Sequence, residues 1–145
     1  MANLTVSAVL DAAPDRVWAD VRDISSHTEW MNDAVAIRFT SPSTEGVGTT
    51  FDCDTKVGPI RLTDRMEVTE WVDASTMGVR HVGLVTGTGA FTLTPLPFDR
   101  TRFTWAEELE FPWWMGGRLG ARMAVPVLSH VWRRSMANLT ARFSH

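Results

Sequence analysis

Residues 112–143 read PWWMGGRLGARMAVPVLSHVWRRSMANLTARF, and this stretch predicts one long helix around which the rest of the chain folds. At about 100° per residue, its polar side chains gather on one narrow arc that includes Arg118, Arg122 and Arg133. The opposite arc is wide and apolar, which is typical of a helix that lies on a sheet. Pro126 falls near the polar arc, where we expect it to bend the helix around the core.

Alternating apolar residues before this helix predict a seven-stranded antiparallel sheet, and so an α+β fold. After the first strand, two short helices are expected, the first beginning at Pro14 and the second capped by Asp23. Six further strands are joined by short turns, with one face solvated and the other covered by the long helix. The predicted strands begin near Leu4, Val35, Val47, Ile60, Met77, Gly87 and Phe103.

The composition is that of one globular domain over residues 1–145. The chain is 44% hydrophobic and 21% charged, and no apolar run approaches the ~20 residues of a membrane span. Its beginning lacks the pattern of a signal peptide. Cys53 is the only cysteine, which excludes an internal disulfide and favours a cytoplasmic location.

Charge is unevenly distributed, although the net charge is only −3. Five arginines and no acidic residue follow Glu110. Either this basic helix faces solvent opposite an acidic sheet, or it is a docking face for an anionic lipid surface or another anionic partner. An acidic chain without a basic, aromatic strand motif is not expected to bind nucleic acid. The histidines show no metal-ligand spacing, so no metal is expected.

Three ionisable side chains fall on the inward rows of the predicted sheet. Asp64, His81 and Glu107 alternate in phase with apolar residues on three different strands. Because burying a lone charge is costly, each needs a partner, a shifted pKa or water. The pattern is compatible with acid–base catalysis, with a polar anchor for a ligand, or with a structural polar pair. Cys53 shares the inward face, but without a neighbouring base or cation we expect a small buried residue.

Several local sequences resemble the START/Bet v 1-like (SRPBCC) superfamily, specifically its bacterial polyketide cyclase/dehydrase and lipid-transport branch. The clearest are residues 12–18 (AAPDRVW), 45–51 (EGVGTTF) and 68–71 (VTEW), and residues 112–114 (PWW) also fit. The resemblance covers nearly the whole chain and implies a helix-grip fold, in which a curved sheet wraps around the C-terminal helix. It also implies a deep cavity for lipids, polyketides or other hydrophobic molecules, with cyclase or dehydratase activity in some members.

The first hypothesis is therefore a protein that binds a hydrophobic small molecule, without a cofactor, with Asp64, His81 and Glu107 as its polar anchor. The second is a cofactor-independent cyclase, aromatase or dehydratase in which His81 and either Glu107 or Asp64 form the acid–base pair. In both cases the expected ligand-binding wall consists of Trp30, Phe51, Cys53, Met66, Met77, Phe91, Trp105, Leu128 and Val131.

A third hypothesis places the function on the surface. Trp113 and Trp114 form an apolar cluster that either packs under the start of the helix or forms a lip for transient contact with a membrane or partner. Trp71 falls out of phase with the inward row of its strand and is expected at a turn or on the surface. The segment Gly87-Thr88-Gly89 predicts a bulge, or a place where the sheet makes room for the helix.

Overall fold

The computed structural model describes residues 2–144, and its elements follow the predicted order. Strand β1 (Ala2–Leu10) precedes helix α1 (Pro14–Val21) and the 3-10 helix η1 (Ile24–Glu29). A second 3-10 helix, η2 (Trp113–Met115), precedes the long helix α2 (Gly117–Arg142). Between them lie six strands, β2 (Ala34–Phe39), β3 (Thr50–Val57), β4 (Ile60–Val72), β5 (Thr76–Val82), β6 (Thr86–Leu96) and β7 (Arg100–Glu110).

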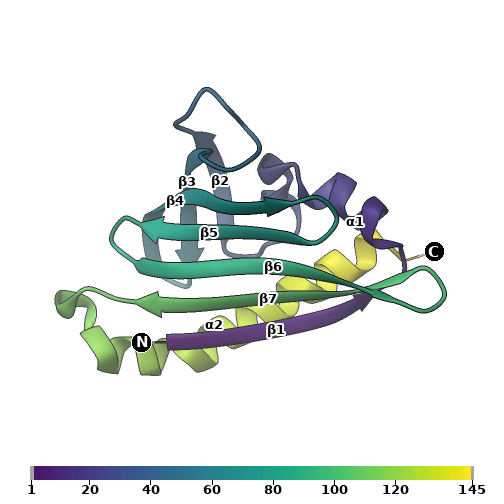
Figure 1. Cartoon of the computed structure of the whole chain (residues 1–145). Helices are drawn as coiled ribbons and strands as arrows, with labels where there is room; N and C mark the ends of the chain where they lie inside the picture. The colour runs from purple at the N-terminus through teal and green to yellow at the C-terminus, as the bar shows by residue number, and fades with distance from the viewer. Residues whose placement is uncertain (1, 145) are drawn as a thin grey trace.

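All seven strands form one sheet in the order β1-β7-β6-β5-β4-β3-β2, and every neighbouring pair is antiparallel. Figure 1 shows that the sheet curls, so that β2 and β3 lie behind β4 to β6, while α2 crosses diagonally behind β1 and β7. The predicted α+β fold, a curved antiparallel sheet around a C-terminal helix, is confirmed.

The two short helices form as the sequence predicts. Pro14 opens α1, where its missing N–H costs no helical hydrogen bond. The Asp23 side chain caps η1 by accepting a hydrogen bond from the backbone N–H of Ser25 at 3.2 Å. One face of α1 is buried, and Trp18 on that face donates a hydrogen bond from its indole N–H to Asp73. These contacts close one end of the curled sheet.

The long helix begins later than predicted. Gly116 has a φ of 95°, in the left-handed region, so it ends η2 and separates this turn from α2. From Gly117 the helix continues through Pro126, which lies on its exposed face, to Arg142. It packs mainly against β1. At its end, Arg142 forms two hydrogen bonds with Asp20, which tie α2 to α1.

Two register shifts change which residues face inward. One lies between Val68 and Glu70 in the pairing of β4 with β5, and it brings Trp71 opposite the buried Met77. Trp71 therefore packs edge-on against Trp18, with 5.2 Å between ring centroids, and the prediction of a surface aromatic is wrong. The other shift lies at the start of β2, between Ala34 and Ala36.

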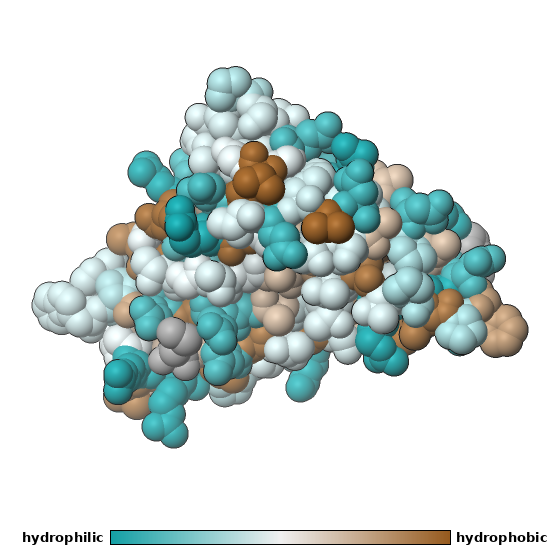
Figure 2. Space-filling view, viewed as in Figure 1, coloured by the Kyte–Doolittle hydropathy of each residue, from teal (hydrophilic) through white to brown (hydrophobic). Residues whose placement is uncertain are grey.

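The two faces of the sheet differ in chemistry. Figure 2 shows the outer face as largely hydrophilic or neutral, with hydrophobic residues in separate small groups. The inner face carries the core, including Val68, Phe91 and Phe103. No helix among residues 2–144 is long and apolar enough to cross a membrane.

Candidate functional site

A cavity of about 410 Å³ lies between the inner face of the sheet and the first half of α2. Strands β2 to β7 and α2 all contribute to its wall, which is predominantly apolar. The ring of Trp105 on β7 stacks on the ring of Trp132 on α2, with 4.0 Å between centroids. A concave apolar space of this size with a few convergent polar groups is the usual form of a small-molecule site.

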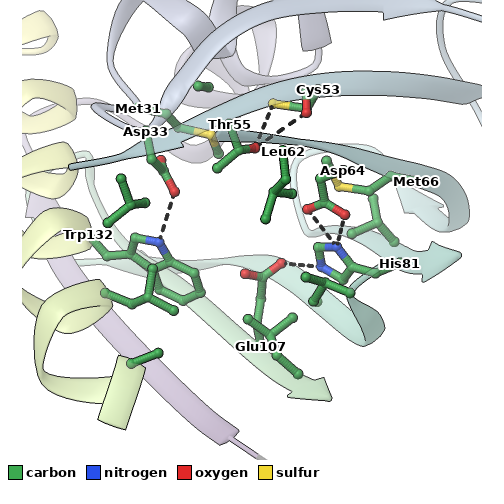
Figure 3. Close-up of a pocket in the computed structure, with 18 of the residues that line it drawn as sticks. Met31, Asp33, Cys53, Thr55, Leu62, Asp64, Met66, His81, Glu107 and Trp132 are labelled. Atoms are coloured by element: carbon green, nitrogen blue, oxygen red, sulfur yellow. Dashed lines mark hydrogen bonds and ion pairs between the residues drawn. The ribbon is translucent and has the colours of Figure 1, made fainter. Parts of the chain in front are cut away.

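Asp64, His81 and Glu107 converge on one wall of this cavity (Figure 3). Nδ1 of His81 lies 2.9 Å from both carboxyl oxygens of Asp64. On the other side of the ring, Nε2 lies 2.6 Å from Oε1 of Glu107. The imidazole thus bridges two carboxyl groups. All three side chains are largely buried, with 3% of His81, 15% of Asp64 and 8% of Glu107 exposed.

The sheet register explains how three strands that are not all neighbours bring these groups together. Asp64 is on β4, His81 on the adjacent β5, and Glu107 on β7, with β6 between them. Gly89 of β6 is paired with Glu107. A Cβ atom at Gly89 would lie 2.5 Å from Oε1 of Glu107, so the absence of a side chain lets Glu107 lie across β6 and reach His81. The glycine segment makes room for Glu107 here, whereas the sequence indicated room for the helix or a bulge.

The bridged histidine is a buried cation. Burial alone lowers the pKa of His81, but its hydrogen bonds and charge interactions with Asp64 and Glu107 outweigh this and raise the pKa to about 10. Burial raises the pKa of Glu107, against the opposing effect of the hydrogen bond from His81. With both ring nitrogens donating to carboxyl oxygens, His81 has no free nitrogen to accept a proton from a ligand.

Asp33 is a fourth polar group that the sequence analysis missed. It precedes β2 and lines the cavity, and its Oδ2 accepts a hydrogen bond from Nε1 of Trp132 at 3.3 Å. Burial raises its pKa. In sequence it looks like an ordinary turn residue before a strand, and the register shift after Ala34 hides its phase. The only available signal was its spacing of two residues from Val35, the apolar residue near which the predicted strand begins.

Two further reactive residues on the wall are in inert environments. His27 is buried, its Nε2 lies 2.8 Å from the carbonyl oxygen of Val21, and burial lowers its pKa to about 4. Its neutral ring packs against Trp30 and Phe91, so it presents an aromatic surface. Burial also raises the pKa of the Cys53 thiol to about 12. A thiol in this state is a poor nucleophile, as expected of a small buried residue.

The structure places most of the expected ligand-binding residues on the cavity wall, but not Trp30 or Val131. Trp30 is only 1% exposed and packs inside a cluster of aromatic rings with Phe91 and Phe103. Val131 is half-buried and does not line the cavity, whereas the adjacent Trp132 does. The expected residues that do line the cavity are Phe51, Cys53, Met66, Met77, Phe91, Trp105 and Leu128.

An exposed apolar lip lies near the cavity. Trp113 and Trp114 are 86% and 58% exposed, and the next residue, Met115, lines the cavity. The first half of α2 adds Leu119, Met123 and other apolar side chains that are exposed to solvent. Of the two predicted arrangements for the tryptophans, packing under the helix is therefore wrong. Within residues 2–144, no three metal-ligating side chains are grouped as a metal site.

Comparisons with solved structures support this fold. A START superfamily protein from Mycobacterium smegmatis matches with a TM-score of 0.77 at 11% identity, over 97% of this chain and 96% of that one. The XoxI protein of Bacillus cereus matches with a TM-score of 0.77 at 14% identity, over 99% and 96%. An aromatase/cyclase from Streptomyces sp. R1128 matches with a TM-score of 0.69 at 15% identity, over 97% and 92%.

The comparison with curated proteins returned no match. Among protein-family models, the one described as "Polyketide cyclase / dehydrase and lipid transport" matches residues 1–144. Since that match spans nearly the whole sequence, the chain belongs to the polyketide cyclase/dehydrase and lipid-transport family.

Proposed function

We propose that this protein binds a hydrophobic small molecule in the cavity between the sheet and α2. The observation that carries the proposal is the cavity itself, an apolar space of about 410 Å³ with polar side chains on one wall. A single-domain core of this size is normally close-packed, so an apolar void this large is costly unless it is filled by a ligand.

The location of the void also supports binding. Exposed apolar residues of α2, including Met123 and Val127, are also part of the cavity wall. Ile60, next to the turn between β3 and β4, has the same two properties. An apolar molecule can therefore pass from the surface to the interior along side chains that already face water.

A titration with N-phenyl-1-naphthylamine, a neutral apolar probe whose fluorescence rises in apolar surroundings, tests the proposal. Leu62 of β4 lines the cavity, while its neighbour Thr63 points to the outer face and is exposed. Leu62→Trp should fill the cavity and reduce probe affinity by about tenfold or more, whereas Thr63→Trp adds the same bulk outside and should leave it unchanged. Equal binding by both variants would show that the probe binds elsewhere.

The second candidate function is acid–base catalysis, and the state of Glu107 favours it. Its carboxyl group is buried at the cavity wall, and burial raises its pKa, as in carboxyl groups that act as general acids. In this version Glu107 transfers the proton, and His81, already bonded on both sides, holds it in place. A Glu107→Gln variant that loses turnover but still binds the probe would support acid–base catalysis by Glu107. Unchanged turnover in that variant would show that Glu107 does not transfer the proton.

A further inference from the structure

The polar groups of the cavity wall are unbalanced in charge. Three carboxyl groups, those of Asp33, Asp64 and Glu107, face the same interior space (Figure 3). Among residues 2–144, the one cationic group that accompanies them is the His81 imidazolium. Among the described residues, no lysine or arginine side chain lines the cavity. A bound molecule therefore meets more acidic groups than basic ones.

The strongest hydrogen-bond donors of the wall are already occupied. Both N–H groups of His81 donate to protein carboxylates, one to Asp64 and one to Glu107. The indole N–H of Trp132 donates to Oδ2 of Asp33. None of these three N–H groups is free to donate to a ligand.

The remaining polar side chains of the wall follow the same pattern. The Thr55 hydroxyl donates to the backbone carbonyl oxygen of Cys53 at 3.3 Å. His27 is neutral, and because a carbonyl oxygen can only accept, its Nε2–H must donate to Val21. Its other ring nitrogen is then an acceptor.

Acceptor capacity remains on the carboxyl groups, although the Asp33 carboxyl group also accepts a hydrogen bond from its own backbone N–H. Among residues 2–144, the only side-chain donor to Asp33 is Trp132, and it bonds Oδ2. Within the same residues, the only side-chain donor to Glu107 is His81, which bonds Oε1. Each group therefore keeps an oxygen without a side-chain donor. In Figure 3, one oxygen of Glu107 points away from His81 into the open space toward Trp132.

We propose that the cavity selects apolar molecules with a protonated amine, whose ammonium group donates hydrogen bonds to Asp33 and Glu107. This inference rests on the proposed function, and it names the ligand class. An ammonium ion has three donors and no acceptor, so it matches a wall that offers acceptor oxygens, and its charge favours the ionised form of the carboxyl groups beside it. A ligand carboxylate would be desolvated beside three carboxyl groups without a cationic partner, and would be excluded. A neutral alcohol would bind with intermediate affinity.

Three probes with the same alkyl chain test this class by isothermal titration calorimetry at about pH 7, where an alkylamine is protonated as lysine is. Decylamine should bind tightest, 1-decanol less tightly, and decanoate at least about tenfold more weakly than decylamine. Decanoate binding as tightly as decylamine would overturn the proposed selectivity while leaving the hydrophobic site intact. If none of the three binds, the proposed function fails as well.

Two substitutions test whether the carboxyl groups of Asp33 and Glu107 accept the hydrogen bonds of the ammonium group. Asp33→Asn and Glu107→Gln keep the size of each side chain but remove its charge, so each should weaken decylamine binding by about tenfold and change 1-decanol binding by less than about threefold. The matched control is Asp54→Asn, because Asp54 lies on the outer face of β3, bonded to Arg38. Equal losses for decylamine and 1-decanol would mean that these carboxyl groups only maintain the cavity, and would overturn their role in selecting amines.

Discussion

The two halves of α2 differ in how closely they pack against the rest of the protein. In the second half, Ser135, Met136 and Leu139 are buried, and Ser135 accepts a hydrogen bond from the backbone N–H of Asn32. In the first half, Met123 and Val127 are exposed on one side and border the cavity on the other. One end of the helix completes a close-packed core, and the other covers a hollow. A continuous amphipathic helix therefore does not imply a continuous core.

The largest expected effect comes from truncating leucine in each half. Leu139 is 0% exposed, so Leu139→Ala should lower the free energy of unfolding by about 3–4 kcal/mol. Leu128 is half-buried beside the cavity, and Leu128→Ala should cost only about 1 kcal/mol because the space beside it is already empty. Urea denaturation of both variants measures the difference. Equal losses would mean that the first half of the helix is as well packed as the second.

The two buried histidines make stability depend on pH in opposite directions. The pKa of His81, near the hollow half, is raised to about 10, so its contribution to stability is complete below about pH 6.5 and is lost as the pH rises toward 10. The pKa of His27, on η1, is lowered to about 4, so its contribution is complete above about pH 6.5 and is lost as the pH falls toward 4.

Urea denaturation across this range should therefore show an alkaline loss of unfolding free energy that is absent from His81→Gln. The acid loss should be smaller in His27→Gln than in the wild type. An alkaline loss that persists in His81→Gln would assign it to other groups and contradict a protonated His81 in the cavity wall.

A smaller effect is expected at Gly89, which lets Glu107 cross β6. Gly89→Ala places a Cβ atom against the Glu107 carboxyl group and should cost about 1–2 kcal/mol of unfolding free energy. In a Glu107→Ala background the same substitution should cost almost nothing, because the obstructing side chain is gone. Equal costs in both backgrounds would mean that strand geometry, and not the position of Glu107, requires the glycine.

Much of this architecture follows from periodicity in the sequence. Strand alternation has a period of two, so it placed Asp64, His81 and Glu107 on the inner face without knowledge of the strand order. Their convergence could not be predicted, because it depends on β6 lying between β5 and β7 with a glycine at the crossing point. Periodicity also failed at the two register shifts, which brought Trp71 inward and concealed Asp33.

Prediction from the sequence of α2 meets a similar limit. Its apolar arc was predicted correctly, but a wide arc does not say which side chain fills the space in front of it. Val131 and Trp132 are adjacent in sequence but about 100° apart on that arc, and of the two only Trp132 lines the cavity, where it stacks on Trp105. The start of the helix was placed too early because Gly116 adopts a left-handed conformation that the apolar pattern does not reveal.

Native mass spectrometry tests the central claim, an interior that holds a ligand, most directly. The protein purified from cells should carry a bound mass that is released on unfolding and extracted into organic solvent. The Leu62→Trp variant, with its cavity filled, should carry none of it, and Thr63→Trp should carry as much as the wild type. The same adduct on all three proteins would contradict a ligand inside the cavity.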